Sequence, residues 1–350
     1  FLTNSYLTFP RTRGAAVNLT VLVIAIFIGA ALLEVLSRLV FPIVPAARDL
    51  MLDGTPVGIN SPTNPYRHRE GLKFRQVSSE FDVTISITQK GHRAPSVVGN
   101  PDTVFLGDSF TFGQGLDDED TFPSIYCAEA SISCANLGRN GTGTGDQIDI
   151  LEHYLESEGW KPRQVILVML VMSTGLAAGN DFLDNILHSR KEKKVSRISK
   201  SINDTKYSTS SLYRIVKNEI IFHSNLFRLT YFYFAPWLRL HFTPEIEHGL
   251  LDEAAKATRI QLNRLQEISD KYGFQYRIFV AHPIQDILRG THSETINLVR
   301  RLAPAMNAQS TAPAFISDPH RYYYAYDGHF NRQGSLSLAK YLSRELAAGN

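Results

Sequence analysis

The 350-residue sequence carries little net charge, only two cysteines and no internal repeat. A formal charge of +2 gives no electrostatic reason to expect a nucleic-acid partner, because nucleic-acid binders concentrate Lys and Arg on one face. Cysteine is scarce, but a chain of this length can bury a core that needs no disulfide staples. No group of His, Cys, Asp and Glu has the spacing of metal ligands, so we expect neither a metal nor a cofactor.

One apolar run near the N-terminus is long enough to span a membrane. Residues 15–36 read AAVNLTVLVIAIFIGAALLEVL, close to the roughly 20 residues that a helix needs to cross the hydrocarbon core. A cleaved signal peptide and a buried core helix are the alternatives, but the run is long for a signal peptide and no small-residue cleavage site follows it directly. We predict a tail over residues 1–14 and one transmembrane anchor over residues 15–40.

The orientation of this anchor decides where the rest of the chain lies. Arginines on its two sides are nearly balanced, so the positive-inside rule is close to a tie. A short N-terminal tail before such an anchor usually stays in the cytoplasm. We therefore expect a single-pass protein of the inner (cytoplasmic) membrane, with its larger part in the periplasm or outside the cell.

If the larger part of the chain is exported, its two cysteines lie in an oxidising compartment. Cys127 and Cys134 are separated by AEASIS, and they fall at the end of a predicted helix and the start of the next predicted strand. In an oxidising compartment this spacing can close a small disulfide loop. Two buried thiols that act as small hydrophobes are the other interpretation, and both remain open at this point.

Downstream of the anchor, apolar segments alternate with helix-length segments. Residues 41–100 read as a linker, rich in Pro, Gly and Asn up to residue 70, with a short alternating β segment over residues 81–87. Strands are then predicted at Thr103–Leu106, Cys134–Leu137, Val165–Leu170 and Tyr276–Ala281. Helices are predicted at Thr121–Ala130, Gln147–Glu158, Leu251–Tyr272 and Ser335–Leu346. This alternation predicts an α/β domain over residues 101–350, with a parallel sheet covered on both faces.

Polar segments follow the predicted strands. The first strand leads into Gly107–Gly113 (GDSFTFG), where a serine stands in a tight turn at the carboxyl edge of the sheet. The second leads into the glycine-dense Gly138–Gln147, which is neither a P-loop nor a Rossmann fingerprint but presents backbone N–H groups to an anion. Gly179–Asn185 follows the third strand, and Tyr326–Asn331 (YDGHFN) precedes the last helix. Each segment alone is ordinary turn or capping chemistry.

Together and in this order, the four segments resemble the motifs of the SGNH (GDSL-type) hydrolase family. The resemblance covers residues 103–350 and is strongest to membrane-anchored bacterial members, which carry a similar GDSFTFGxG turn and a closing DGHFN. It implies a three-layer α/β/α fold of flavodoxin-like type with a mainly parallel sheet, and activity on esters or other acyl groups. Only Gly328 separates Asp327 from His329, a spacing found in a subset similar to polysaccharide O-acetylation proteins.

The resemblance also assigns catalytic roles. It implies that Ser109 is the nucleophile and that His329 is its general base. Asp327 would orient the imidazole and stabilise its charged form, following the logic of a catalytic triad.

An oxyanion hole is implied in the same way. Its donors would be the backbone N–H of Ser109, a backbone N–H of the glycine loop and the side-chain amide of Asn180. Within that loop, Gly141 matches the conserved glycine of the family by its distance from Asn136 and is the implied donor, with Gly143 as the fallback.

The segment from 188 to about 250 is the least family-like part of the chain and reads as an insertion. Residues 188–200 contain six Lys or Arg and one Glu, which is most often a solvated face and alternatively a contact with anionic lipid or an acidic polymer. The aromatic stretch over residues 231–238 is best explained by core packing, with a lid or a membrane-interface segment as alternatives.

The sequence thus predicts a membrane-anchored serine esterase whose partner is an ester-bearing small molecule or an acylated glycan. The O-acetyl groups of a cell-envelope glycan are one expected substrate. An O-acyltransferase that passes the acyl group to a polysaccharide hydroxyl is the first alternative, because it needs the same residues. A non-catalytic scaffold in envelope assembly is the second. Protein partners are unknown at this point.

Overall fold

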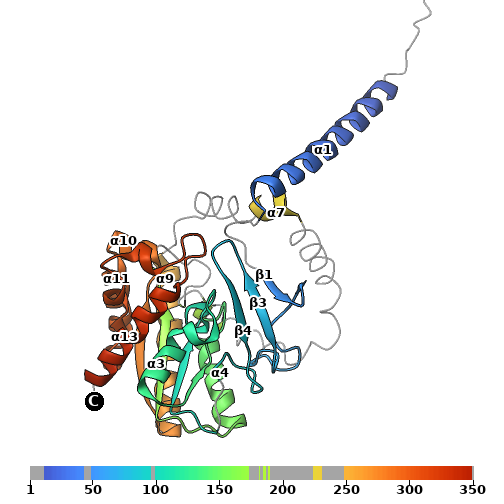
Figure 1. Cartoon of the computed structure of the whole chain (residues 1–350). Coiled ribbons are helices and arrows are strands. Elements are labelled where there is room, and N and C mark those ends of the chain that lie inside the picture. Colours follow the sequence, from blue (N-terminus) through green and yellow to red (C-terminus); the bar gives the residue numbers. More distant parts are fainter. Residues whose placement is uncertain are drawn as a thin grey trace, which may run out of the picture. The chain divides into compact units, whose positions relative to one another are not determined.

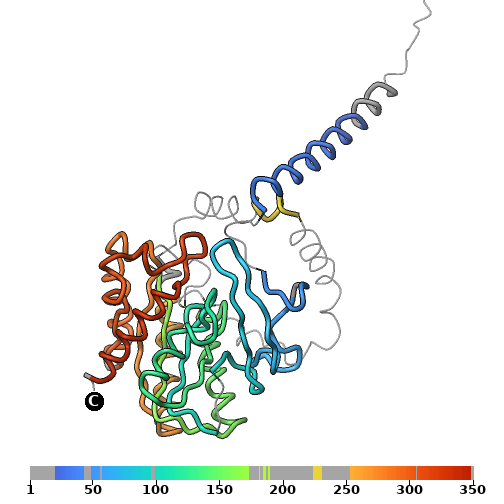
Figure 2. The backbone as a smooth tube through the Cα atoms, viewed as in Figure 1, coloured from blue at the N-terminus to red at the C-terminus, as the bar shows by residue number. Residues whose placement is uncertain are grey.

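The computed structural model describes residues 12–42, 49–95, 99–172, 181, 184–186, 188–189, 224–230 and 248–348. The chain divides into two compact units, which are described separately (Figures 1 and 2). The first unit contains α1 (Thr12–Val40) and α7 (Asn225–Leu229), and the second contains the other described elements. Asn180, most of the predicted insertion and its aromatic stretch lie outside the described residues.

α1 coincides with the predicted anchor. Its residues Thr20–Val40 have a mean hydropathy of 2.5 and are long and apolar enough to cross a membrane or to act as a signal sequence. Near the end of α1, the carboxylate of Glu34 accepts hydrogen bonds from the backbone N–H groups of Asn225 and Leu226, at 2.9 and 3.0 Å. A side chain of α1 therefore caps the first turn of α7, although the two segments lie 191 residues apart in the sequence.

The second unit is built around a five-stranded parallel sheet. Its strands are β5 (Thr103–Gly107), β6 (Cys134–Asn136), β7 (Gln164–Leu170), β8 (Gln275–Ala281) and β9 (Gln309–Ser310). Their order is β6-β5-β7-β8-β9, and every neighbouring pair is parallel. This is the 2-1-3-4-5 order of flavodoxin-like folds, whose ligands bind where the strand order reverses, here beside β5.

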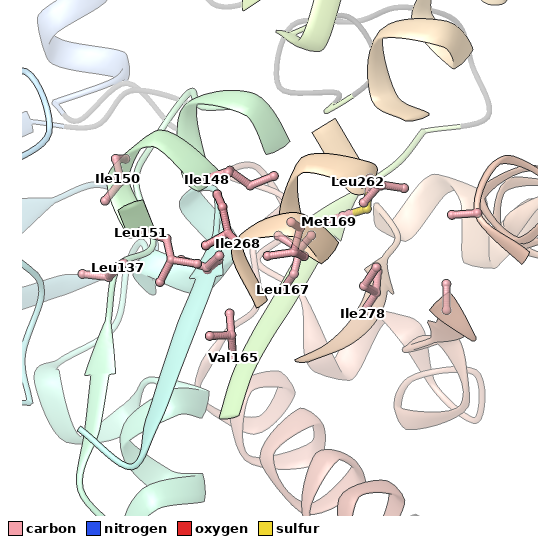
Figure 3. Close-up of a cluster of buried hydrophobic side chains, with 14 of the residues drawn as sticks. Leu137, Ile148, Ile150, Leu151, Val165, Leu167, Met169, Leu262, Ile268 and Ile278 are labelled. Carbon is pink, nitrogen blue, oxygen red and sulfur yellow. The ribbon is translucent and has the colours of Figure 1, made fainter. Parts of the chain in front are cut away.

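Successive strand residues point to opposite faces of this sheet. In β7, Val165 and Leu167 belong to one buried cluster, whereas Ile166 and Val168 belong to the other. The first cluster includes side chains of α4 (Thr144–Ser157), α9 (His248–Tyr272) and α11 (His292–Leu302), and part of it appears in Figure 3. The second includes side chains of α3 (Phe122–Ala130), α10 (Ile284–Arg289) and α13 (Arg332–Ala348). Both faces are covered, which confirms the expected three-layer α/β/α fold.

Shorter elements complete this unit. They are α2 (Ser109–Phe112), α12 (Pro319–Tyr322) and the 3-10 helices Asp118–Asp120, Pro304–Met306 and Ala312–Ala314. The two cysteines form a disulfide that joins α3 to the start of β6, with their Cα atoms 6.1 Å apart. The structure therefore favours the bridge over the two free thiols that the spacing alone also allowed.

A second, antiparallel sheet precedes the parallel one in the chain. It consists of β1 (Asp49–Leu52), β2 (Thr55–Pro56), β3 (Lys73–Val77) and β4 (Asp82–Ser86), in the order β2-β1-β3-β4. Residues 49–56 were expected in a linker, but β1 and β2 form a hairpin around the Asp53–Gly54 turn, and β1 also pairs with β3. The Asp-Gly turn is a local hairpin signal that the prediction missed, whereas the pairing with β3 leaves none. Phe112 of α2 lies in the same buried cluster as Phe74 of β3 and Ile85 of β4, so this sheet packs against the serine turn.

Candidate active site

The predicted serine lies at the carboxyl end of β5, where the strand gives way to α2. Asp108 caps α2, and its carboxylate accepts a hydrogen bond from the backbone N–H of Phe110. A Cβ atom at Gly107 would lie 2.8 Å from the carbonyl oxygen of Val168, so only glycine lets the turn pass this close to β7. The turn therefore presents Ser109 at the edge of the sheet, as the first residue of α2.

Ser109, His329 and Asp327 form a continuous chain of hydrogen bonds. The Oγ atom of Ser109 lies 2.6 Å from Nε2 of His329, and Nδ1 of His329 lies 2.6 Å from Oδ1 of Asp327. Asp327 and His329 share one turn ahead of α13, 218 and 220 positions beyond the serine, so the fold unites residues from its two ends. The imidazole also packs against the ring of Phe110, with centroids 4.5 Å apart. The structure thus brings together all three residues that the sequence predicted.

Two amide side chains extend this chain of contacts. Nε2 of Gln114 lies 3.2 Å from each carboxylate oxygen of Asp327 and 3.0 Å from Nδ1 of His329. Oε1 of Gln114 accepts a hydrogen bond of 3.1 Å from Nδ2 of Asn140. Gln114 therefore links the acid of the triad to the glycine loop. The sequence analysis did not identify either amide. Gln114 lies within the stretch GDSFTFGQG, but a single glutamine in a loop gives no sign of its partners.

The glycine loop distinguishes the two candidate oxyanion donors. Gly141 has a φ of +69° and lies in the wall of the same cavity as Ser109, whereas Gly143 is buried. A Cβ atom at Gly143 would meet the Cβ of Asp184 at 2.5 Å, so this glycine serves close packing. Of the two, Gly141 is the one whose backbone faces the serine's cavity. Asn180 lies outside the described residues.

The cavity around the serine has a volume of about 620 Å³. Both sheets contribute to it: Leu50 of β1 and Gln76 of β3 lie in its wall together with Leu170 of β7. The loop between β8 and α10 and the loop of Asp327 form the remaining sides. Its lining mixes apolar side chains with amides, a composition suited to a small ester that carries polar groups.

Two buried carboxyl groups interact near the serine: Asp108, which belongs to the serine turn, and Asp181, which contacts β7. Burial raises the pKa of Asp108 to about 6, although the Phe110 N–H that it accepts acts in the opposite direction. Burial, aided by the charges of Asp108 and Asp184, raises the pKa of Asp181 well above its usual range. Asp181 accepts hydrogen bonds from the backbone N–H of Leu170 and from Gln147. Asp181 therefore joins β7 to α4, whereas Asp108 stabilises the serine turn by capping α2.

Within the described residues, no group of three or more His, Cys, Asp or Glu is arranged to hold a metal ion. The acidic run at residues 117–120 has structural partners instead. Asp117 and Asp118 accept hydrogen bonds from the backbone N–H groups of Thr84 and Ser86 in β4. This run attaches the antiparallel sheet to the rest of the unit.

No family model matches the sequence, and no curated protein matches it. Among solved structures, a psychrotrophic esterase from a Pseudoalteromonas species is 12% identical, covers 71% of this chain and 100% of its own, and has a TM-score of 0.39. A catalytic mutant of an acetylxylan esterase from Geobacillus stearothermophilus is 16% identical, with 71% and 95% covered and a TM-score of 0.36. A Desulfitobacterium hafniense structure, described as a lipolytic protein of the G-D-S-L family, is 13% identical, with 70% and 99% covered and a TM-score of 0.38.

Proposed function

We propose that this chain is a serine esterase of the SGNH type, which cleaves an ester or O-acyl group through an acyl-serine intermediate. One observation carries the proposal: Ser109, His329 and Asp327 form an unbroken hydrogen-bonded chain in the wall of a cavity of about 620 Å³. A nucleophile, a base and a group that orients the base, each within hydrogen-bond reach of the next, are the arrangement that acyl transfer requires.

In the first half of the reaction, Oγ of Ser109 attacks the acyl carbon while Nε2 of His329 takes the hydroxyl proton. The carboxylate of Asp327 holds the proton on Nδ1 and stabilises the imidazolium that forms. When the tetrahedral intermediate collapses, His329 returns the proton to the leaving alcohol, and the acyl group stays on Ser109. A water molecule then attacks the acyl carbon, His329 takes its proton and passes it to Ser109, and the free acid leaves.

The negative charge on the intermediate requires hydrogen-bond donors. We assign this role to the backbone N–H groups of Ser109 and Gly141 and to the side-chain amide of Asn180. The position of Gly141 in the cavity wall supports its part, and the order of the sequence motifs supports that of Asn180. Losing one such donor typically lowers the rate about 100-fold or more.

We propose that the substrate is an O-acetyl group of a cell-envelope glycan. We also propose that the catalytic part of the chain lies in the periplasm or outside the cell. Two features support this location: an apolar helix long enough to cross a membrane, and the disulfide between Cys127 and Cys134. Disulfides persist in oxidising compartments and are rare in the cytosol.

An O-acyltransferase is the second candidate, and the single residue between Asp327 and His329 favours it, because that spacing resembles polysaccharide O-acetylation proteins. A sugar hydroxyl would then replace water in the second half of the reaction. The test is turnover of an activated acetyl ester by the full chain and by Ser109→Ala, with and without an oligosaccharide acceptor. Hydrolysis that depends on Ser109 supports the esterase, acetylated oligosaccharide supports the transferase, and no turnover by the wild type in either assay rejects both.

A further inference from the structure

The turn between β3 and β4 reaches the loop that carries the catalytic acid. The carboxylate of Glu80 accepts hydrogen bonds from three successive backbone N–H groups, those of Ala325, Tyr326 and Asp327, at 2.6, 3.1 and 2.7 Å. Hydrogen bonds to an ionised acceptor are stronger than those between neutral groups. One side chain thus fixes the backbone direction of the segment that presents the Asp327 carboxylate to His329.

The same hairpin, residues 73–86, also holds the segment that carries Gln114. Oε1 of Gln76 in β3 accepts a hydrogen bond of 2.8 Å from the backbone N–H of Gly115. Phe81 packs against Tyr324 with ring centroids 5.0 Å apart, and the hydroxyl of Tyr324 donates to the carbonyl of Gly115 at 2.7 Å. The hairpin therefore contacts both segments that bring the acid and the imidazole together.

The turn itself is well supported. Oγ of Ser78 accepts hydrogen bonds from the backbone N–H groups of Glu80 and Phe81, at 3.0 and 3.2 Å. The backbone N–H of Ser78 donates to the carbonyl of Phe81 at 2.8 Å. These hydrogen bonds fix the backbone of the turn at Glu80. The carboxylate of Glu80 can therefore contact the loop of residues 325–327 from a defined position.

We infer that the β3–β4 hairpin is part of the catalytic centre, with Glu80 as a positioning residue for Asp327. This rests on the proposed function, because it gives Glu80 its role through the triad. Residues between the membrane helix and the α/β domain, which the composition placed in a linker and a short β segment, would then be needed for catalysis. The contribution is geometric, because Glu80 holds the backbone of the loop while the carboxylate that contacts the imidazole belongs to Asp327.

Removal of the carboxylate has a defined kinetic consequence. Glu80→Ala leaves the three N–H groups without their acceptor and frees the loop to shift, and a displacement of about 1 Å at a catalytic group lowers the rate about 100-fold. We expect kcat to fall by about 10- to 100-fold and KM to rise by a smaller factor, because the loop that shifts contributes Asp327 to the triad and Ala325 and Tyr326 to the cavity wall. Glu80→Gln keeps one carbonyl oxygen as an acceptor, so its kcat should lie between those of Glu80→Ala and the wild type.

Asp82→Asn is the matched control. It removes one negative charge from the same hairpin, but Asp82 pairs with Arg75 on the exposed side, and both side chains are more than half exposed. We expect this variant to keep the kcat of the wild type. A comparable loss of kcat in Asp82→Asn would show that the charge or the stability of the hairpin explains the effect of Glu80. It would overturn the inference.

The experiment measures ester hydrolysis by the full chain in detergent, with kcat expressed per serine titrated by a fluorophosphonate. Titration removes the contribution of unfolded protein, and Glu80→Gln carries the test if Glu80→Ala does not fold. The order wild type, Glu80→Gln, Glu80→Ala in falling kcat supports the inference. Equal kcat values in an active series overturn it and leave the proposed function intact, whereas a wild type that neither turns over nor titrates rejects the proposed function itself.

Discussion

The amide nitrogen of Gln114 lies 3.2 Å from both carboxylate oxygens of Asp327. The Asp327 carboxylate therefore has a neutral amide donor in addition to its contact with the imidazole of His329. Because the other end of the same amide accepts from Asn140, the acid and the glycine loop share one bridging side chain. The position of the imidazole is thus determined by a network wider than three residues.

Gln114→Met tests this bridge. Methionine has a similar size but provides no amide donor, so the carboxylate of Asp327 loses one hydrogen bond and the loop of Asn140 loses its acceptor. A hydrogen bond to a charged group contributes about 1.5–3 kcal/mol, which corresponds to a fall of roughly 10- to 100-fold in kcat/KM. Gln333→Met, at an exposed glutamine of α13, is the control and should keep full activity. Unchanged kcat/KM in Gln114→Met would show that the amide of Gln114 does not support Asp327 in the reaction.

Asn180→Ala tests the oxyanion hole. If the amide of Asn180 donates to the developing oxyanion, kcat for a reactive ester should fall about 100-fold or more while KM changes little. The rate of fluorophosphonate labelling at Ser109 should fall with it, because that reaction develops a similar charge. A variant that hydrolyses the ester at the wild-type rate would show that another group fills this role.

Asp108 predicts a pH dependence of stability. Its pKa is raised from 3.8 to about 6 by burial, so the folded chain holds a proton between these values that the unfolded chain has released. The contribution of protonated Asp108 to the free energy of unfolding is fully present below about pH 4 and is lost as the pH rises through about 6. The pKa shift corresponds to a loss of about 3 kcal/mol. Asp108→Asn cannot ionise and lacks this loss. Its free energy of unfolding in urea, relative to the wild type, should rise between pH 4 and 7.5; a constant difference contradicts the account.

The disulfide predicts both a mass and a stability effect. Freshly exported protein should have an intact mass two hydrogens below that of the reduced chain, and alkylation without reduction should modify neither Cys127 nor Cys134. A bridge over a separation of seven residues restrains the unfolded chain by about 2–3 kcal/mol. The double variant Cys127→Ala, Cys134→Ala should therefore unfold at lower urea concentration. Two free thiols in exported protein would reject the bridge.

The central strands and helices were predictable because their signal is local. A strand buried on both faces is a short apolar run, and residues 165–170 form β7 with one more residue at its start. Helix α9 extends the prediction for residues 251–272 by three residues at its N-terminus. The proposed catalytic residues Ser109, His329 and Asp327 were found for a different reason, which is that each stands in a short motif next to such an element.

Most of the antiparallel sheet and its contacts with the proposed catalytic residues were not predictable in this way. β1 and β2 are four and two residues long. β2 pairs with β1 across the Asp53–Gly54 turn, whereas the pairing of β1 with β3 joins residues more than twenty positions apart. Glu80 and Gln114 are single polar residues whose partners lie 247 and 213 positions further along the chain. Helix α11 was missed although Ile296, Val299 and Leu302 follow helical spacing, so in that case the signal was present in the sequence.

The most direct test of the central claim is to map the site at which a fluorophosphonate attaches to the 350-residue chain. We expect one equivalent of label on Ser109, no label on Ser109→Ala, and strongly slowed labelling of His329→Ala, because the hydroxyl then lacks its base. Wild-type protein that takes no label, under conditions in which a known serine hydrolase is labelled completely, would contradict the assignment of Ser109 as a nucleophile. It would point instead to a non-catalytic role in the envelope.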